Sequence, residues 1–195
     1  MKQLRAFWPA IIFVALSIVA ISKKNLLRNL TTYSSINWQI LVENILLLIA
    51  IQIIAFTLFK IHPVFKQSLL TLVRKNEDEK VPFLAKIFND YKLAVPLFVL
   101  LLLINAPSLV RIEELIFRQG TNSWWSDGII RSATFGLLHS ALGVPLGIGL
   151  ASILTGLWLT YQYFGGGIEL SILHHTTYNT LVLGMIITTS LMNKN

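Results

Sequence analysis

Six stretches of the chain are rich in apolar residues and are separated by short polar or basic segments. About 20 apolar residues suffice for one crossing of a lipid bilayer, so we interpret each stretch as a membrane-spanning helix. The six predicted spans are residues 7–22, 38–59, 93–105, 129–142, 145–164 and 168–192. The pattern therefore predicts an all-α fold, a polytopic transmembrane helix bundle of about six spans plus short amphipathic helices.

The polar segments between the spans differ in length and charge. Lys23, Lys24 and Arg28 lie in a predicted polar loop after the first span. Residues 60–92 form the longest hydrophilic stretch, and its apolar residues recur at helical spacing on both sides of a turn at 75–80. This spacing predicts two short amphipathic helices that lie on the membrane surface or against the bundle. The positive charge of the stretch places it in the cytoplasm.

A break is predicted directly after the third span. In Asn105-Ala106-Pro107-Ser108, an asparagine or serine can cap a new helix, and proline is tolerated in a first helical turn. We therefore expect a separate helix at 107–119 and a polar loop at 121–128, with two tryptophans at a membrane interface. A second turn is expected at the glycine triplet 165–167, between the last two spans.

Composition agrees with a membrane protein. The chain is 54% hydrophobic and only 13% charged, whereas about 25% of the residues in a soluble domain are charged. Its net charge of +7 comes from Lys and Arg that flank apolar runs, so we expect no nucleic-acid partner. The absence of cysteine excludes a disulfide framework and thiolate chemistry.

We interpret the chain, 1–195, as a single integral membrane domain. Residues 1–92 hold the N-terminal spans and the cytoplasmic amphipathic loop, and residues 93–195 hold the helices with the candidate catalytic groups. Glu43 interrupts the second span within two turns of its start. We expect it to have a structural role, either by snorkelling to the membrane surface or by capping the helix.

Ionisable and polar side chains inside the later apolar segments are the candidates for function. An ionisable group at membrane depth costs at least about 2.5 kcal/mol and marks a functional site by default. The candidates are Glu113, Glu114, Arg118, His139, His174, His175 and Asn179. They are spread over three predicted helices, and their burial is less costly if they face one another across a water-filled cavity.

Helical spacing divides these candidates between faces. Glu114 and Arg118 are four residues apart with the acid first, the better orientation for an ion pair within a helix. Glu113 lies about 100° around the helix, so we expect it to face a different neighbour and to be free for chemistry. An equally simple interpretation is that both glutamates and Arg118 form only an ion-pair cluster at the end of their helix. His175 and Asn179 share one face, and they too could serve only hydrogen bonding between helices.

Two chemistries need these residue types. In the first, a carboxylate and an imidazole activate water for attack on a carbonyl, and a second imidazole with an amide N–H stabilises the oxyanion. In the second, Glu113, His139 and His175 bind a divalent metal such as zinc, which activates the water. The residue pattern does not decide between them. No serine or cysteine nucleophile with a matching base is visible, which argues against a covalent acyl-enzyme.

The order of three short motifs resembles a known family. Glu-Glu-x-x-x-Arg at 113–118, Phe-x-x-x-His at 135–139 and His-x-x-x-Asn at 175–179 each fall on a predicted membrane helix. This trio is similar to the motifs of the CPBP intramembrane proteases. The family includes the type II C-a-a-X prenyl endopeptidases and bacterial relatives linked to bacteriocin processing and self-immunity. The resemblance covers residues 107–192, under half of the chain.

The resemblance implies an intramembrane endopeptidase that hydrolyses a peptide bond of a membrane-associated protein or peptide. Glu113 is expected to activate the attacking water together with His139. His175 and Asn179 are expected to donate hydrogen bonds to the oxyanion. Members of the family are thought to use a glutamate-type mechanism without a metal, so we expect no cofactor and keep a divalent metal as the alternative.

Glu114 and Arg118 correspond to the supporting acid and the arginine of the first motif. The expected location is a prokaryotic plasma membrane, where the chain crosses the bilayer several times. Two other functions stay open. The chain could be a non-catalytic self-immunity or scaffold protein that binds a membrane peptide without cutting it. It could also be a small transporter or proton channel, because intramembrane Glu and His also serve proton relays.

Overall fold

The computed structural model of the chain describes residues 23–73 and 94–192. Every regular element in these two ranges is a helix, so the predicted all-α class is confirmed. In chain order, the helices are α2 (Lys23–Ser34), α3 (Trp38–Ile61), η1 (Pro63–Lys66), α4 (Leu69–Val73), α6 (Ala94–Phe117), η2 (Trp124–Gly128), α7 (Ile129–Ala141) and α8 (Leu146–Met192). The predicted span at 7–22 and the second predicted amphipathic helix lie outside the described residues.

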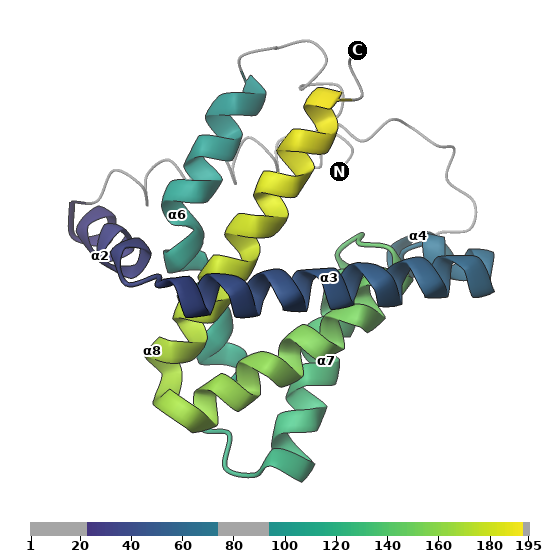
Figure 1. The fold of residues 1–195 in the computed structure, drawn as a ribbon. Helices are drawn as coiled ribbons and strands as arrows, with labels where there is room; N and C mark the ends of the chain where they lie inside the picture. The colour runs from purple at the N-terminus through teal and green to yellow at the C-terminus, as the bar shows by residue number, and fades with distance from the viewer. Residues whose placement is uncertain (1–22, 74–93, 193–195) are drawn as a thin grey trace, which may run out of the picture.

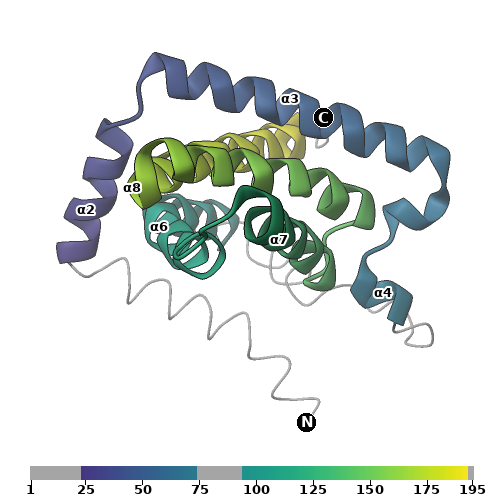
Figure 2. The ribbon, with the colours of Figure 1, turned by 90° about the horizontal axis from the view of Figure 1, so that it is seen from below.

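Helix α8 is the centre of the arrangement (Figure 1). It contacts α3, α6 and α7, and Figure 2 shows it between α3 on one side and α6 and α7 on the other. Gly166 and Gly167 bend it, and Gly167 has a φ of 73°, which residues other than glycine rarely adopt. The two halves of α8 therefore match the predicted helices at 145–164 and 168–192, and the turn at the glycine triplet is confirmed.

Helix α3 confirms the helix predicted at 38–59. It begins after Asn37, whose side chain accepts a hydrogen bond of 2.9 Å from the backbone N–H of Ile40. Its buried face packs on α8, where Leu47, Ile51 and Ala55 join Ala151 and Tyr178 in one hydrophobic core. Within the described ranges, α3 is the one helix that is long and apolar enough to cross a membrane.

Residues 23–34 form a helix, α2, and not the predicted polar loop. The stretch contains neither glycine nor proline, and two of its polar side chains lie four residues apart and reach α6. The Asn29 amide donates to the carbonyl of Ile104 at 2.8 Å, and the Tyr33 hydroxyl donates to the carbonyl of Leu103. The sequence showed the polar character of the stretch, but these contacts to a distant helix explain why it is ordered as a helix.

Helix α6 runs without a break through Pro107, so the predicted separate helix at 107–119 is wrong. Proline has no N–H to donate to the carbonyl four residues earlier, which here belongs to Leu103. The Tyr33 hydroxyl donates to that carbonyl instead. A side chain of α2 thus replaces the missing backbone hydrogen bond, and the continuous helix places Glu113 and Glu114 near its C-terminal end, which is Phe117.

Helix α7 confirms the helix predicted at 129–142 and packs very closely against the first half of α8. A Cβ atom at Gly136 would lie only 2.5 Å from the carbonyl oxygen of Gly149. Glycines that allow such an approach are a common device of helix packing. The predicted loop at 121–128 is only partly irregular, because a π-helical turn, η2, occupies Trp124–Gly128.

Candidate functional site

The candidate site lies where the C-terminal part of α6 meets the second half of α8. Helix α6 contributes two adjacent carboxylates, Glu113 and Glu114, and α8 contributes the imidazole of His175. Glu114 and Arg118 are completely buried, and His175 is 1% exposed. Such burial of charged groups requires mutual pairing and hydrogen bonding.

Glu114 is held by three partners. Its Oε1 lies 2.7 Å from Nδ1 of His175, and its Oε2 accepts a hydrogen bond from the hydroxyl of Ser171. Nε of Arg118 lies 3.6 Å from the same Oε2, so the predicted ion pair within α6 is confirmed. The pair is nevertheless not the shortest contact, because the imidazole of α8 lies closer to the carboxylate than the guanidinium does.

Glu113 approaches the same imidazole from its other nitrogen. Its Oε2 lies 3.4 Å from Nε2 of His175. The expectation that the two glutamates face different neighbours is therefore wrong, because the crossing of α6 and α8 places one imidazole between both carboxylates. The two acids still differ in environment. The side chain of Glu113 is 39% exposed, although its Oε2 atom is buried and accepts no hydrogen bond from the described residues.

These contacts fix the orientation of His175. A carboxylate can only accept a hydrogen bond, so the proton on Nδ1 of His175 is directed to Glu114. Nε2 is then the nitrogen that faces Glu113. In many proteins a carboxylate bonds to one ring nitrogen of a functional histidine. This contact orients the ring and determines the role of the second ring nitrogen.

Arg118 is stabilised by more than Glu114. Its Nη2 donates to the carbonyl of Gly156 in the first half of α8 at 3.2 Å. Its guanidinium carbon lies 4.6 Å from the centre of the Phe135 ring, within the range of a cation–π contact. Nε and Nη1 of Arg118 have no hydrogen-bond partner in the described ranges. The arginine thereby links α6, α7 and α8 beneath the two glutamates.

His139 lies next to this cluster but does not contact either glutamate. Its Nδ1 is 2.7 Å from the carbonyl oxygen of Phe135, so this nitrogen donates within α7. The Phe135 ring packs against His139 at 4.6 Å and against His175 at 5.5 Å between centroids, so it contacts both imidazoles. Among the described residues, no hydrogen bond or ion pair joins His139 to Glu113 or Glu114.

Asn179 lies one helical turn after His175 and is half-buried. Its side chain makes no hydrogen bond within the described part of the chain, so it is available to a bound molecule. Glu113, His139 and His175 do not come together as a ligand set, and no group of three metal-binding side chains occurs among the described residues.

Three polar residues that contact His175's partner Glu114 or contact His174 were not among the predicted site residues. Ser171 could have been found, because it lies four residues before His175 and so shares its helical face. Glu43 was given only a structural role, yet its Oε2 lies 3.7 Å from Nε2 of His174. Asn44 contacts the other nitrogen of the same ring at 3.0 Å. No local signal joins α3 to a histidine 130 residues later.

We compared the chain with protein-family models, with curated proteins and with solved structures, and found no match in any of the three.

Proposed function

We propose that this chain is an intramembrane endopeptidase of the CPBP type. It would hydrolyse a peptide bond of a membrane-associated protein or peptide by means of a glutamate-activated water. The observation that carries the proposal is the position of His175 between two carboxylates, of which Glu114 is fully buried and Glu113 is partly accessible. An acid with one accessible edge beside an oriented imidazole is the arrangement that general-base attack by water requires.

Glu113 is the base in this proposal. A water at its exposed edge contacts the carboxylate, and Glu113 takes one proton as the water oxygen bonds to the substrate carbonyl carbon. The proton then passes from Glu113 to the nitrogen of the leaving amine as the carbon–nitrogen bond breaks. Glu114 does not contact substrate. It holds Nδ1 of His175, so that Nε2 stays directed at the reacting groups.

The negative oxygen of the tetrahedral intermediate needs hydrogen-bond donors. Nε2 of His175 and the amide of Asn179 lie on one face of α8 and are the proposed donors. Nε2 donates in the positively charged form of the ring, in which both nitrogens carry a proton. His139 is proposed to position the water from α7, with its Nδ1 occupied by the carbonyl of Phe135 and its Nε2 left for that purpose. The three helices of the site each contribute one part of this chemistry.

The proposal includes a location. We propose that the chain crosses a prokaryotic plasma membrane several times, with α3, α6, α7 and the two halves of α8 among about six spans. The exposed apolar residues of α3 support this, since Leu46, Ile53 and Phe56 are each about 60% exposed to the surroundings of the molecule. The polar groups of the site then lie inside the bundle, where intramembrane charges are expected.

The test compares the membrane peptides of cells that contain the wild-type chain with those of cells that contain Glu113→Gln. We expect peptides released by the wild type to disappear in the variant, and cleavage of a synthetic peptide derived from them to fall by about 10²- to 10⁴-fold. His139→Ala should give a smaller loss of the same kind. Glu169→Gln serves as the control, since Glu169 pairs with Arg111 at the surface and has no part in the proposed chemistry.

Cleavage by Glu113→Gln and His139→Ala at the wild-type rate would contradict the proposed roles. If no peptide differs between wild type and Glu113→Gln, while a biological effect of the chain survives the substitution, the function is that of a non-catalytic immunity or scaffold protein. Mass spectrometry of the membrane peptides measures both outcomes in one experiment.

A further inference from the structure

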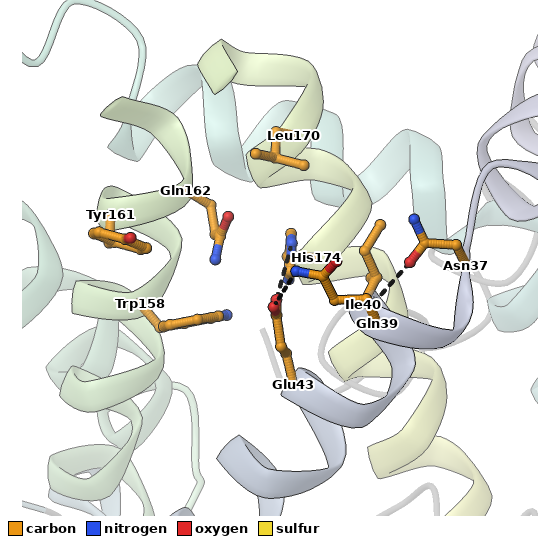
Figure 3. A pocket seen from close by; sticks show the side chains of 9 residues that line it. All are labelled: Asn37, Gln39, Ile40, Glu43, Trp158, Tyr161, Gln162, Leu170 and His174. Atoms are coloured by element: carbon orange, nitrogen blue, oxygen red, sulfur yellow. Dashed lines mark hydrogen bonds and ion pairs between the residues drawn. The ribbon is translucent and has the colours of Figure 1, made fainter. Parts of the chain in front are cut away.

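A polar cavity lies on the side of α8 opposite to the candidate site. It has a volume of about 510 Å³, is open on one side and is lined by the start of α3 and by both halves of α8. Whereas His175 faces α6, its neighbour His174 faces α3 and this cavity (Figure 3). None of the groups proposed for hydrolysis lines it, so its function is a separate question. Its lining residues are Asn37, Gln39, Ile40, Glu43, Trp158, Tyr161, Gln162, Leu170 and His174.

The hydrogen bonds of His174 define its protonation. Nδ2 of Asn44 donates to the carbonyl of Ile40 at 2.8 Å, which identifies it as the amide nitrogen. The same Nδ2 lies 3.0 Å from Nδ1 of His174, so Nδ1 accepts. An imidazolium would direct an N–H at that amide N–H, and the two donors would oppose each other. His174 is therefore neutral, and its proton is on Nε2.

Among the described residues, Glu43 consequently has no cationic partner. Its Oε2 lies 3.7 Å from Nε2 of the neutral His174, and its Oε1 accepts a hydrogen bond of 2.9 Å from the Gln39 amide. No lysine or arginine is among the residues that line the cavity. The side chain of Glu43 is only 29% exposed. The cavity thus carries one negative charge that nothing in its wall neutralises.

The opposite wall is aromatic and contains unused polar atoms. The rings of Trp158 and Tyr161 stack at 5.6 Å with an angle of 29° between their planes. Gln162 is 7% exposed and makes no hydrogen bond within the described residues, and Nε1 of Trp158 is buried without a partner there. Figure 3 shows the Gln162 amide and the indole nitrogen directed into the space that also contains the Glu43 carboxylate.

We propose that this cavity binds a ligand with an ammonium group. The carboxylate of Glu43 supplies the opposite charge, and the amide oxygens of Gln39 and Gln162 accept its N–H bonds. Attraction between charges is stronger in a partly enclosed cavity than in water. A neutral ligand of the same size would fill the volume but would leave the charge of Glu43 unpaired.

The site does not depend on the proposed hydrolysis, since it uses neither Glu113 nor His175. The ammonium group has two sources, a water-soluble alkylamine or the ethanolamine headgroup of a membrane lipid. Both place the same cation between the carboxylate and the aromatic wall. The lipid composition of the test membrane distinguishes them.

The experiment uses the purified full chain in nanodiscs of phosphatidylglycerol, which has no amine. Binding of ethylammonium is measured by saturation-transfer NMR, with empty discs subtracted, and is compared with its uncharged shape analogue n-propanol. We expect ethylammonium to bind, and Glu43→Gln to weaken its binding by about tenfold or more. Gln162→Leu should weaken it less. The matched control Glu169→Gln, which removes a carboxylate already paired with Arg111, should bind like the wild type.

Equal binding of ethylammonium and n-propanol would overturn the proposal, and so would unchanged binding to a Glu43→Gln protein whose circular dichroism is that of the wild type. The lipid arm repeats the titration in discs that contain phosphatidylethanolamine. If the headgroup occupies the cavity, the apparent affinity for ethylammonium falls in the wild type but not in Glu43→Gln. An affinity that is the same in both membranes identifies a water-soluble amine as the ligand. Loss of peptide cleavage in Glu113→Gln alters none of these results.

Discussion

His174 and His175 are consecutive residues of one helix, yet they occupy two opposite kinds of site. His175 faces α6 and lies between Glu113 and Glu114. His174 faces α3 and lies between the Asn44 amide and the Glu43 carboxylate. Both imidazoles are almost fully buried, and both have a glutamate near Nε2. What differs is the partner of Nδ1, a carboxylate for one histidine and an amide N–H for the other.

That single difference sets the chemistry of each side. A carboxylate at Nδ1 accepts a hydrogen bond from His175 and is compatible with a positively charged ring. The site of Glu113 and Glu114 therefore has a counter-charge available on α8 itself. An amide N–H at Nδ1 keeps His174 neutral, so Glu43 has no counter-charge among the described residues. The same pair of residue types therefore gives a candidate proton-transfer site on one face of α8 and a candidate cation-binding site on the other.

The largest predicted difference between the two faces of α8 is in the free energy of unfolding when one carboxylate is removed from each. Glu114→Gln leaves Arg118 as a buried cation without its ion pair, which should lower the free energy of unfolding by about 3–5 kcal/mol. Glu43→Gln should change it by only about 0–1 kcal/mol, because Glu43 is partly exposed and pairs with a neutral ring. Equilibrium unfolding in mixed detergent micelles, followed by circular dichroism, measures both values.

The double variant Glu114→Gln with Arg118→Met provides the control. It removes the stranded cation as well, so it should be more stable than Glu114→Gln alone. Equal losses for Glu114→Gln and Glu43→Gln would show that the two sides do not differ in the way that their burial implies.

A smaller effect should follow from widening the contact between α7 and α8. A methyl group at Gly136 would meet the Gly149 carbonyl and the side chain of Ile153 at 2.5–2.7 Å, and we expect Gly136→Ala to cost about 1–3 kcal/mol. Phe135, the residue before it, packs on Arg118 and His175. The substitution should therefore reduce peptide cleavage more than ethylammonium binding, whose cavity is built by α3 and α8.

Gly184→Ala is the matched control for this prediction. A Cβ atom at Gly184 meets nothing within 4 Å, and alanine is the better helix former, so we expect a change between zero and about 1 kcal/mol of added stability. Thermal unfolding of the two alanine variants in the same micelles compares them directly. If Gly136→Ala is as stable as Gly184→Ala, α7 and α8 can move apart at little cost, and the packing of Phe135 does not depend on their close approach.

The helix pattern was readable from the sequence wherever it depended on local signals. The positions of α3, α7 and the bend at the glycine triplet follow from apolar periodicity and from glycine. The course of α6 through Pro107 did not, because the carbonyl of Leu103 is satisfied by Tyr33, about seventy residues earlier. A proline ends a helix only if no other group donates to the carbonyl that its missing N–H leaves free. Such a donor can lie far away along the chain, so it cannot be recognised from the sequence.

The candidate site, too, could be predicted from the sequence only where its contacts lie within one helix. The spacing of Glu114 and Arg118 predicted their ion pair, and the spacing of Ser171 and His175 could have predicted a shared face. Helical spacing could not predict that both glutamates reach one imidazole, since that depends on how α6 and α8 cross. Nor could it pair Glu43 with His174, which requires knowing that α3 packs on the opposite side of α8 from α6 (Figure 2).

The smallest predicted effect concerns the hydrogen bond that makes the two histidines different. In the wild-type chain labelled with ¹⁵N-histidine, NMR should show an unprotonated Nδ1 for His174 and a protonated Nδ1 for His175. Asn44→Leu removes the donor to His174 at a cost of about 1 kcal/mol. We expect the proton of His174 to become shared between its two nitrogens, while the signals of His175 stay unchanged.

His174→Gln assigns the resonances, because it removes one imidazole and leaves α8 intact. A protonated Nδ1 on both histidines of the wild type would remove the distinction between the two faces. It would also allow His174 to supply a counter-charge beside Glu43, and the cavity would then need no cation from outside. The state of one ring nitrogen, set by the orientation of the Asn44 amide, thus decides whether α8 carries one polar function or two.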